Sequence, residues 1–199
     1  MKKLVIYIHG KGGNIKEIDH YKQMFKDYDM IGFDYHSDNL WAAKKEFTCF
    51  FDLCSKKYEY IILIANSIGA YYSLYSLNNK KIDKAFFISP IVNMEKLIYD
   101  MMNQANITEE ELKEKQEIKT DFGETLSWNY LCYAKEQKIE WNVNTFILYG
   151  EKDALTTYET ISEFAKNIGA SLTVMPNGIH WFHTDEQMKF LDDWIKSNL

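Results

Sequence analysis

Three side chains in this sequence have the types and the order along the chain that acyl transfer by a nucleophilic serine requires. They are Ser67, Asp153 and His180, and a glycine-rich stretch, residues 9–14, precedes them. A serine attacks a carbonyl carbon when a base takes its proton, an acid orients that base, and hydrogen-bond donors stabilise the oxyanion. The sequence offers a candidate for each role, so the elements that position these residues decide whether they meet.

Ser67 is the candidate nucleophile, and it lies in the pentapeptide Ala65-Asn66-Ser67-Ile68-Gly69. The apolar run 60–64 before it is typical of a buried strand, and residues 70–77 after it favour a helix. A sharp strand-to-helix turn holds a serine hydroxyl clear of the sheet, and crowding at the turn requires small residues two positions away on each side. A serine at this position is also typical of a helix N-cap. The assignment of Ser67 as a nucleophile therefore depends on the presence of an acid, a base and oxyanion donors elsewhere in the chain.

Asp153 is the candidate orienting acid. It follows the expected strand 145–149 in the stretch Tyr149-Gly150-Glu151-Lys152-Asp153, at the carboxyl end of the predicted sheet. An aspartate here is also typical of a turn or of a cap for the helix that we expect from Thr156. Glu151 is the alternative acid, although it lies closer to the end of the strand.

His180 is the candidate base, because it lies in a loop between the last expected strand and the last expected helix. His183 is the competitor, but it directly precedes the cap residue Thr184 and is therefore tied to the start of that helix. Ser, Asp and His follow one another in an order known for such triads. We expect His9 to brace its loop, and His20 and His36 to be surface residues.

Backbone N–H groups of two residues are the candidate oxyanion donors. Lys11 lies in the stretch His9-Gly10-Lys11-Gly12-Gly13-Asn14 after the first expected strand, and Ile68 directly follows the nucleophile. The same glycines could cradle a phosphate, which is the alternative for this loop. Their spacing fits neither the P-loop nor the dinucleotide-binding pattern.

Short apolar runs alternate with helical periodicity, which predicts parallel strands joined by crossover helices. We expect strands at 4–8, 30–35, 60–65, 84–89, 145–149 and 171–175. We expect helices at 15–28, 40–56, 67–77, 156–168 and from 185 to about 196. Gly169 is a predicted C-cap, and residues 184–187 form a predicted capping box.

Residues 91–142 interrupt this alternation. A connection of this length between two strands must carry structure of its own. We expect helices at 94–104, 108–118 and 126–137. Placed after the fourth strand, the insertion is predicted to stand over the carboxyl ends of the sheet, where open α/β folds bind ligands.

Composition limits the classes of function. The 199 residues suit one domain, and a net charge of −6 with no arginine argues against nucleic acid and weakens the case for anionic substrates. Cys49, Cys54 and Cys132 form no C-x-x-C motif and are expected to be buried thiols of a reducing compartment. The N-terminal apolar run is too short for a signal peptide, so we expect a cytoplasmic protein.

Taken together, these motifs resemble the α/β-hydrolase superfamily, in a small single-domain version similar to serine esterases and lipases. The resemblance covers nearly the whole chain and rests on the stretches HGKGGN, ANSIG, YGEKD and NGIH. It implies a three-layer fold: a mostly parallel six-stranded sheet, with the strand before Ser67 at its centre, helices on both faces and a helical lid. Ala65 departs from the glycine usual in the family, but alanine is still small enough for the turn.

The sequence therefore predicts one α/β-hydrolase domain over residues 1–199, with a lid at about 91–142. It predicts a serine hydrolase, carboxylesterase-like, that cleaves a small or medium acyl ester with Ser67, Asp153 and His180 and the N–H groups of Lys11 and Ile68. We expect no cofactor, no metal, no nucleic acid and no membrane partner. The alternative is a thioesterase, peptidase or C–C hydrolase that uses the same triad. A third hypothesis, from a different functional class, is a non-catalytic protein that binds a small molecule. Substrate-binding residues and oligomeric state stay open.

Overall fold

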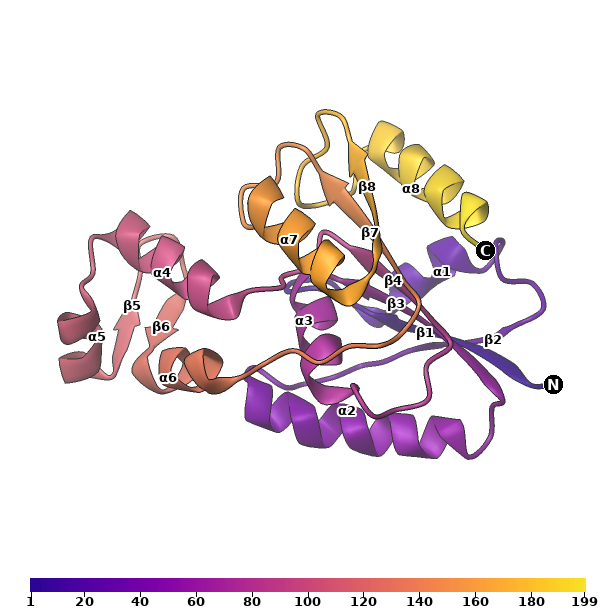
Figure 1. The fold of residues 1–199 in the computed structure, drawn as a ribbon, viewed down its shortest axis with the longest axis horizontal. Coiled ribbons are helices and arrows are strands. Elements are labelled where there is room, and N and C mark those ends of the chain that lie inside the picture. Colours follow the sequence, from indigo (N-terminus) through magenta and orange to yellow (C-terminus); the bar gives the residue numbers. More distant parts are fainter. The chain divides into compact units, whose positions relative to one another are not determined.

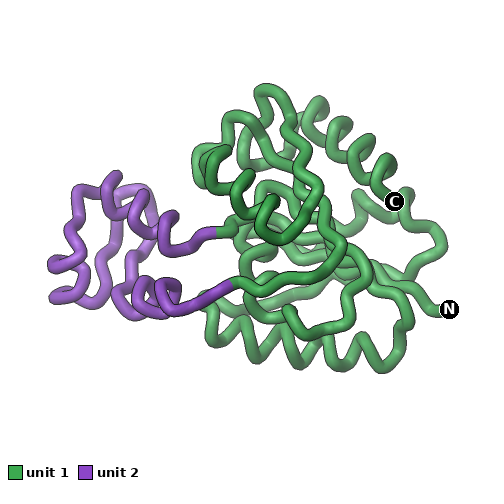
Figure 2. Tube along the Cα trace, in the orientation of Figure 1, with its two compact units in different colours: residues 1–92, 139–199 green, residues 93–138 purple.

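The computed structural model describes all 199 residues, and they form two compact units (Figure 2). The first unit consists of residues 1–92 and 139–199, and the second of residues 93–138. The second unit lies within the stretch where the sequence predicts an insertion.

A six-stranded sheet forms the centre of the first unit, with the strand order β2-β1-β3-β4-β7-β8. All neighbouring strands are parallel, which confirms the α/β prediction. The central strand β3 lies beside β1, so Ile8 pairs with Ala65 and Ala65 with Phe87. The carboxyl ends of these strands therefore meet at one edge of the sheet, and the residues that follow them come together there. The strands are β1 (Lys3–Ile8), β2 (Asp29–Gly32), β3 (Tyr60–Asn66), β4 (Lys84–Ile88), β7 (Thr145–Gly150) and β8 (Ser171–Met175).

Helices cover both faces of this sheet, as expected for a three-layer fold (Figure 1). On one face, α1 (Ile18–Tyr21) and α8 (Asp185–Ser197) bury apolar residues such as Leu191 and Trp194 against Phe86. On the other face lie α2 (Leu40–Ser55), α3 (Ser67–Ser76) and α7 (Tyr158–Ile168). The inner strands are covered on both faces and need continuous apolar runs, which made them recognisable from the sequence. The predicted strand 30–35 is shorter than expected, because β2 at the edge of the sheet ends at Gly32. Gly169 ends α7 in the left-handed conformation, which confirms the predicted C-cap.

The predicted helix 15–28 is wrong over most of its length. The chain forms only a 3-10 turn, η1 (Ile15–Glu17), and the short α1, and then continues in turns. The Met24 N–H donates to the Tyr21 carbonyl and the Tyr28 N–H to the Phe25 carbonyl, both over three residues. Tyr21 and Phe25 bury their rings in the core, so tertiary packing overrides the helical periodicity here.

The second unit contains a hairpin that the sequence analysis missed. Helix α5 ends at Lys115 because Gln116 adopts a positive φ of 66°, and the Trp128 N–H then donates to the Gln116 carbonyl. Residues 116–118 and 126–127 are therefore not helical, in contrast to the prediction. The elements are α4 (Met94–Ala105), α5 (Glu109–Lys115), β5 (Glu117–Lys119), β6 (Thr125–Ser127) and α6 (Trp128–Glu136), with β5 and β6 antiparallel.

All three cysteines are free thiols, but only Cys54 is buried. Cys132 is half-buried and Cys49 is exposed, so the expectation of three buried thiols is wrong for Cys49. Cys49 precedes Phe50 on α2, and the buried stripe of that helix passes instead through Phe47, Phe51 and Cys54. None of the helices combines the length and the apolar character that a membrane span requires.

Candidate active site

Ser67 occupies a strained turn between β3 and α3. Its φ of 48° lies in the left-handed region, which is uncommon for a residue with a Cβ. The turn brings the start of α3 against the end of β1, where a Cβ added to Gly69 would lie 2.4 Å from the His9 carbonyl oxygen. Only glycine fits at that distance, which gives the physical reason for the small residue two positions after the serine. Strain of this kind persists where surrounding structure enforces it, and it clusters at functional sites.

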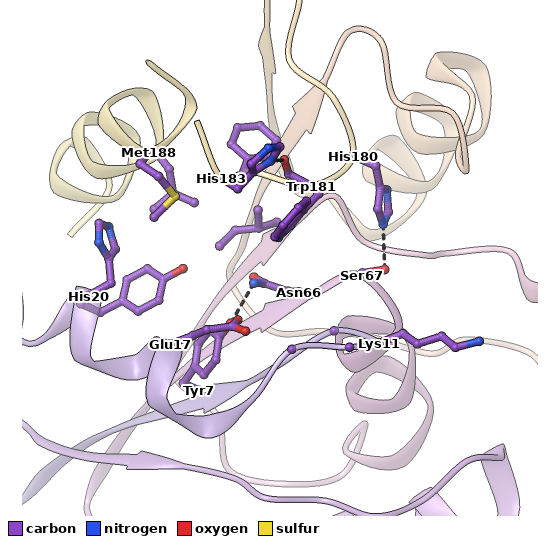
Figure 3. A pocket seen from close by; sticks show the side chains of 17 residues that line it. Tyr7, Lys11, Glu17, His20, Asn66, Ser67, His180, Trp181, His183 and Met188 are labelled. Atoms are coloured by element: carbon purple, nitrogen blue, oxygen red, sulfur yellow. Dashed lines mark hydrogen bonds between the residues drawn. The ribbon is translucent and has the colours of Figure 1, made fainter. Parts of the chain in front are cut away.

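The structure brings Ser67, His180 and Asp153 together, although they are far apart in the sequence (Figure 3 shows the first two). The Ser67 Oγ lies 2.8 Å from the His180 Nε2, and the His180 Nδ1 lies 2.7 Å from the Asp153 Oδ2. Both distances are those of good hydrogen bonds. The imidazole therefore bridges the hydroxyl and the carboxylate through its two nitrogens.

The direction of these hydrogen bonds follows from the chemistry of the partners. An ionised carboxylate only accepts, so the Nδ1–H of neutral His180 donates to Asp153. The Nε2 of that tautomer carries a lone pair and accepts from the Ser67 hydroxyl. This is the arrangement in which a histidine can take the proton of a serine.

Asp153 is held in place by its own loop. Its side chain is fully buried, and its second oxygen, Oδ1, accepts from the backbone N–H groups of Leu155 and Thr156 at 2.8 and 3.1 Å. Asp153 therefore has the predicted turn role together with the contact to His180, but it does not cap the helix, because the N-cap of α7 is Thr157. Two donors on one oxygen fix the carboxylate so that the other oxygen faces the imidazole.

The loops that carry Asp153 and His180 are tied together through their backbones. The Lys152 N–H donates to the Gly178 carbonyl at 2.7 Å, and a Cβ on Gly150 would lie 2.6 Å from the Gly178 carbonyl carbon. Glu151, the alternative acid, points elsewhere: its carboxylate accepts from the Asn177 N–H at 2.8 Å. The structure thus places Asp153, and not Glu151, beside the histidine.

Gln187 is a further support of the histidine loop that the sequence analysis missed. It is 4% exposed, and its side-chain Nε2 donates to the Ile179 carbonyl at 3.2 Å. The sequence analysis treated Gln187 only as the last residue of the capping box at Thr184. The Gln187 N–H donates to the Thr184 hydroxyl at 3.2 Å, and that hydroxyl donates to the Gln187 Oε1 at 3.2 Å, so the side chain joins the helix start to the loop.

The glycine-rich loop lies directly against the nucleophile. A Cβ on Gly10 would be 3.2 Å from the Ser67 Cβ. The Gly13 N–H donates to the Gly10 carbonyl, and Gly12 has a φ of 77°, which describes a tight turn with Lys11 at its corner. Ile68 lies in the first turn of α3, whose N–H groups lack partners within the helix. Lys11 therefore follows a glycine that lies against Ser67, and Ile68 directly follows Ser67 in the chain. That their N–H groups bind an oxyanion stays a prediction.

The remaining histidines have structural partners. His9 stacks on Tyr35 at 4.5 Å, and its carbonyl accepts from the Tyr35 hydroxyl, in agreement with the bracing role. His183 stacks on Trp181 at 3.9 Å and is exposed, so it does not compete with His180. His20 is exposed, as expected of a surface residue, but its Nε2 lies 2.6 Å from the Asp192 Oδ1 and it lines the cavity described below.

A buried hydrogen-bonded chain beside the nucleophile was not recognised from the sequence. The Asn66 Nδ2 donates to the Tyr7 hydroxyl at 2.9 Å, and that hydroxyl donates to Glu17. Burial, the neighbouring Tyr21 and the hydrogen bond to Glu17 raise the pKa of Tyr7 well above its ordinary value, so the hydroxyl keeps its proton. Asn66 and Tyr7 are 59 positions apart in the sequence, and Tyr7 and Glu17 are 10 apart. No local motif indicates contacts between residues at such separations.

A cavity of about 610 Å³ opens beside Ser67 and His180 (Figure 3). Its volume lies within the range of small-molecule sites, about 300–1,000 Å³. One part of its wall is apolar and includes Ile88, Phe182, Met188 and Leu191. The cavity lies entirely within the first unit, so that unit alone carries a hydroxyl, a base and room for a substrate.

Comparison with known proteins gives a consistent result for the fold. No protein-family model matches the sequence. No curated protein matches it by sequence either. Solved structures do match: Est1E from Butyrivibrio proteoclasticus has a TM-score of 0.74 at 16% identity, over 99% of this chain and 86% of that one.

Two further structures resemble the chain over nearly all of its length. Alpha/beta hydrolase domain-containing protein 10 from mouse has a TM-score of 0.75 at 17% identity, over 98% of this chain and 90% of that one. A lipase-esterase related protein from Clostridium acetobutylicum has a TM-score of 0.63 at 16% identity, over 99% and 94%. Together with the sheet order and the turn at Ser67, these similarities show that the chain has the α/β-hydrolase fold.

Proposed function

We propose that this protein is a serine hydrolase that cleaves a small or medium acyl ester. The observation that carries the proposal is the continuous pair of hydrogen bonds from Ser67 through His180 to the buried Asp153. A serine without such partners is a weak nucleophile. The strained turn and the adjoining cavity give the hydroxyl access to a substrate.

The first half of the proposed reaction forms an acyl-enzyme. The Ser67 Oγ attacks the ester carbonyl carbon while the His180 Nε2 takes its proton, and Asp153 stabilises the resulting imidazolium. The N–H groups of Lys11 and Ile68 hold the oxyanion, a contribution of roughly 3–4 kcal/mol for each donor. His180 then gives its proton to the leaving alkoxide, and the C–O bond to the alcohol breaks.

The second half returns the free enzyme. His180 takes a proton from a water molecule, whose oxygen attacks the acyl carbon. The tetrahedral intermediate collapses, His180 returns the proton to the Ser67 oxygen, and the carboxylic acid leaves. No metal or cofactor is needed in this scheme, because every proton moves through His180.

The experiment that tests the proposal is labelling with a fluorophosphonate probe, read by intact mass. We expect one adduct on the wild type and none on Ser67→Ala, together with a loss of p-nitrophenyl ester hydrolysis by about 10⁴–10⁶-fold in the variant. Full esterase activity in Ser67→Ala would contradict the assignment. Absence of an adduct on both proteins would favour the alternative of a small-molecule binder.

The same three residues also serve thioester, peptide and C–C hydrolases, and the fold does not distinguish these reactions. Matched ester, thioester and amide substrates separate them by kcat/KM. Because Est1E was solved with ferulic acid bound, an alkyl ferulate belongs in the ester set. We propose the ester as the substrate class, because one of the similar solved structures is named a lipase-esterase related protein.

A further inference from the structure

The cavity has a polar region that the proposed reaction does not use. Ser67 and His180 lie at one side of it in Figure 3, and His20 and Met188 at the other. Glu17 and Tyr21 also line the cavity away from the nucleophile. Side chains in contact with a substrate decide which substrate fits, so these residues bear on the choice of substrate.

Glu17 is an acceptor with spare capacity in the cavity wall. One carboxylate oxygen accepts from the Asn14 N–H at 2.9 Å, and the other accepts from the Tyr7 hydroxyl. An ionised carboxylate offers about four lone-pair directions, and these two bonds leave the others open. The two donors also fix the carboxylate, so that a ligand would meet a preorganised acceptor.

The charges around Glu17 are mostly negative. Asp192 lies behind His20, with 2.6 Å between its Oδ1 and the His20 Nε2. Lys11 lines the same cavity, but in Figure 3 its side chain extends away from Glu17. Burial and the negative charges of Glu17 and Asp192 raise the pKa of Tyr21 well above its ordinary value, so the hydroxyl keeps its proton.

We propose that this region is a subsite for a hydrogen-bond-donor group of the substrate, a hydroxyl or an ammonium, with Glu17 as its acceptor. The inference rests on the proposed hydrolase function and specifies its substrate class. An anionic group at the same place would face Glu17 and is excluded by charge. The apolar residues Met188 and Leu191 would contact the carbon chain that links this group to the ester.

The test on the wild type uses methyl esters with four different far ends, each in two chain lengths, and their hydrolysis is measured by pH-stat titration. Their far ends carry a methyl, a hydroxyl, an ammonium or a carboxylate group, on butanoyl and on hexanoyl chains. A second set of acetate esters carries the same groups on the alcohol. In at least one set we expect kcat/KM for the hydroxyl or ammonium ester to exceed that for the methyl ester by about 10–100-fold. We expect the carboxylate ester to be the poorest.

Glu17→Gln then tests whether this carboxylate causes the preference. Glutamine keeps the acceptor for the Asn14 N–H, because it can replace glutamate in a capping box. We expect the donor-to-methyl ratio of kcat/KM to fall to about 1–3, since a charge-assisted bond is lost. Asp19→Asn is the matched control, because it removes a nearby charge whose side chain is 63% exposed, and it should keep the wild-type ratio.

The outcomes separate this inference from the proposed function. Equal kcat/KM across both ester sets, or a preference for carboxylate, would overturn the subsite and leave the hydrolase intact. An unchanged ratio in a folded Glu17→Gln protein would also overturn it. If no ester were cleaved, calorimetric titration of the Ser67→Ala protein with hexylammonium, hexanediol and hexanoate would decide: selective binding of the donors supports the subsite, and no selectivity overturns it.

Discussion

At the scale of single residues, Asp153 combines two tasks in one side chain. Its Oδ1 accepts from the backbone of its own loop, while its Oδ2 faces His180. The first task places the carboxylate, and the second selects the imidazole tautomer whose Nε2 is free to accept from Ser67. A substitution that preserves the first task and removes the second therefore isolates the role in catalysis.

Asp153→Asn is that substitution. The amide oxygen can still accept from Leu155 and Thr156, but the NH₂ group would then face the His180 Nδ1 and cannot accept a hydrogen bond from its N–H. The imidazole is expected to switch tautomer, so kcat should fall by about 10⁴-fold with little change in the melting temperature.

Glu151→Gln is the matched control for this experiment, because Glu151 lies on the same loop and is bonded to the Asn177 N–H. Its amide oxygen keeps that bond, so activity should change by less than about threefold. A loss of similar size in both variants would assign the effect to the loop and not to the acid. Full activity in Asp153→Asn would remove Asp153 from the proposed triad.

Some residues of the candidate site were predictable from the sequence, and others were not. Ser67, Asp153 and His180 were predicted because each lies in a short motif next to a recognisable strand. Glu17, Asn66 and Gln187 have roles that depend on contacts between distant elements, and no spacing along the chain reports those contacts. Their pattern becomes visible only once β1, β3 and α8 are placed.

At the scale of elements, the contact between β1 and α3 sets the position of Ser67. Gly69 allows it, because its hydrogen faces the His9 carbonyl and the Ile8 side chain. The His9 carbonyl also accepts from the Tyr35 hydroxyl at 2.9 Å, so its position is fixed from the other side. The nucleophile therefore depends on a backbone contact as well as on its partners.

Gly69→Ala should push α3 away from β1. The added Cβ would lie 2.4 Å from the His9 carbonyl oxygen and 2.8 Å from the Ile8 Cγ2. Crowding in a packed core typically lowers the free energy of unfolding by about 1–3 kcal/mol, which urea denaturation would measure. Activity should fall as well, because the hydroxyl moves relative to His180.

Ser76→Ala on the same helix is the control for Gly69→Ala. The Ser76 hydroxyl is buried without a hydrogen-bond partner, so its removal should leave stability nearly unchanged or raise it. Equal stability and activity in both variants would show that α3 tolerates the added methyl group. The close approach would then not explain the small residue at position 69.

The elements themselves were predictable to different degrees, for physical reasons. Strands of a sheet covered on both faces need apolar residues at every position, and such runs stand out in the sequence. The stretch 22–28 also carries apolar residues at helical spacing, but its backbone forms turns over three residues at Met24 and Tyr28 in place of a helix. The β5–β6 hairpin is too short to give a periodic signal.

At the scale of the whole molecule, the candidate site lies within one of the two units. The sheet, the three side chains and the cavity all belong to residues 1–92 and 139–199. The predicted function of residues 93–138 as a lid remains a prediction. The stability of the first unit depends on a core that includes tyrosines with hydroxyl groups away from solvent.

Alkaline pH should unfold the protein through these tyrosines. Burial raises the pKa of Tyr7, Tyr21 and Tyr35 above the ordinary value of about 10. The folded state thus favours their neutral forms, and this contribution is complete below about pH 10 and lost as the pH rises further. Tyrosinate absorbance and far-UV circular dichroism would follow the transition together.

We expect an early phase from solvent-exposed tyrosines and a late phase that coincides with the loss of dichroism. Tyr7→Phe should remove part of the late phase. It should also lower stability near neutral pH by about 1–3 kcal/mol, because Glu17 and Asn66 lose their shared partner. A single absorbance phase, complete before any loss of dichroism, would contradict the buried state of these hydroxyls.

The backbone link between Gly150 and Gly178 has a consequence for the motion of the site. Since the two loops share hydrogen bonds at Lys152 and at Glu151, we expect them to move together. A fluctuation of the loops would then change the distance from the His180 Nε2 to the Ser67 Oγ. The hydrogen bond between His180 and Asp153, and with it the tautomer of the imidazole, would be kept.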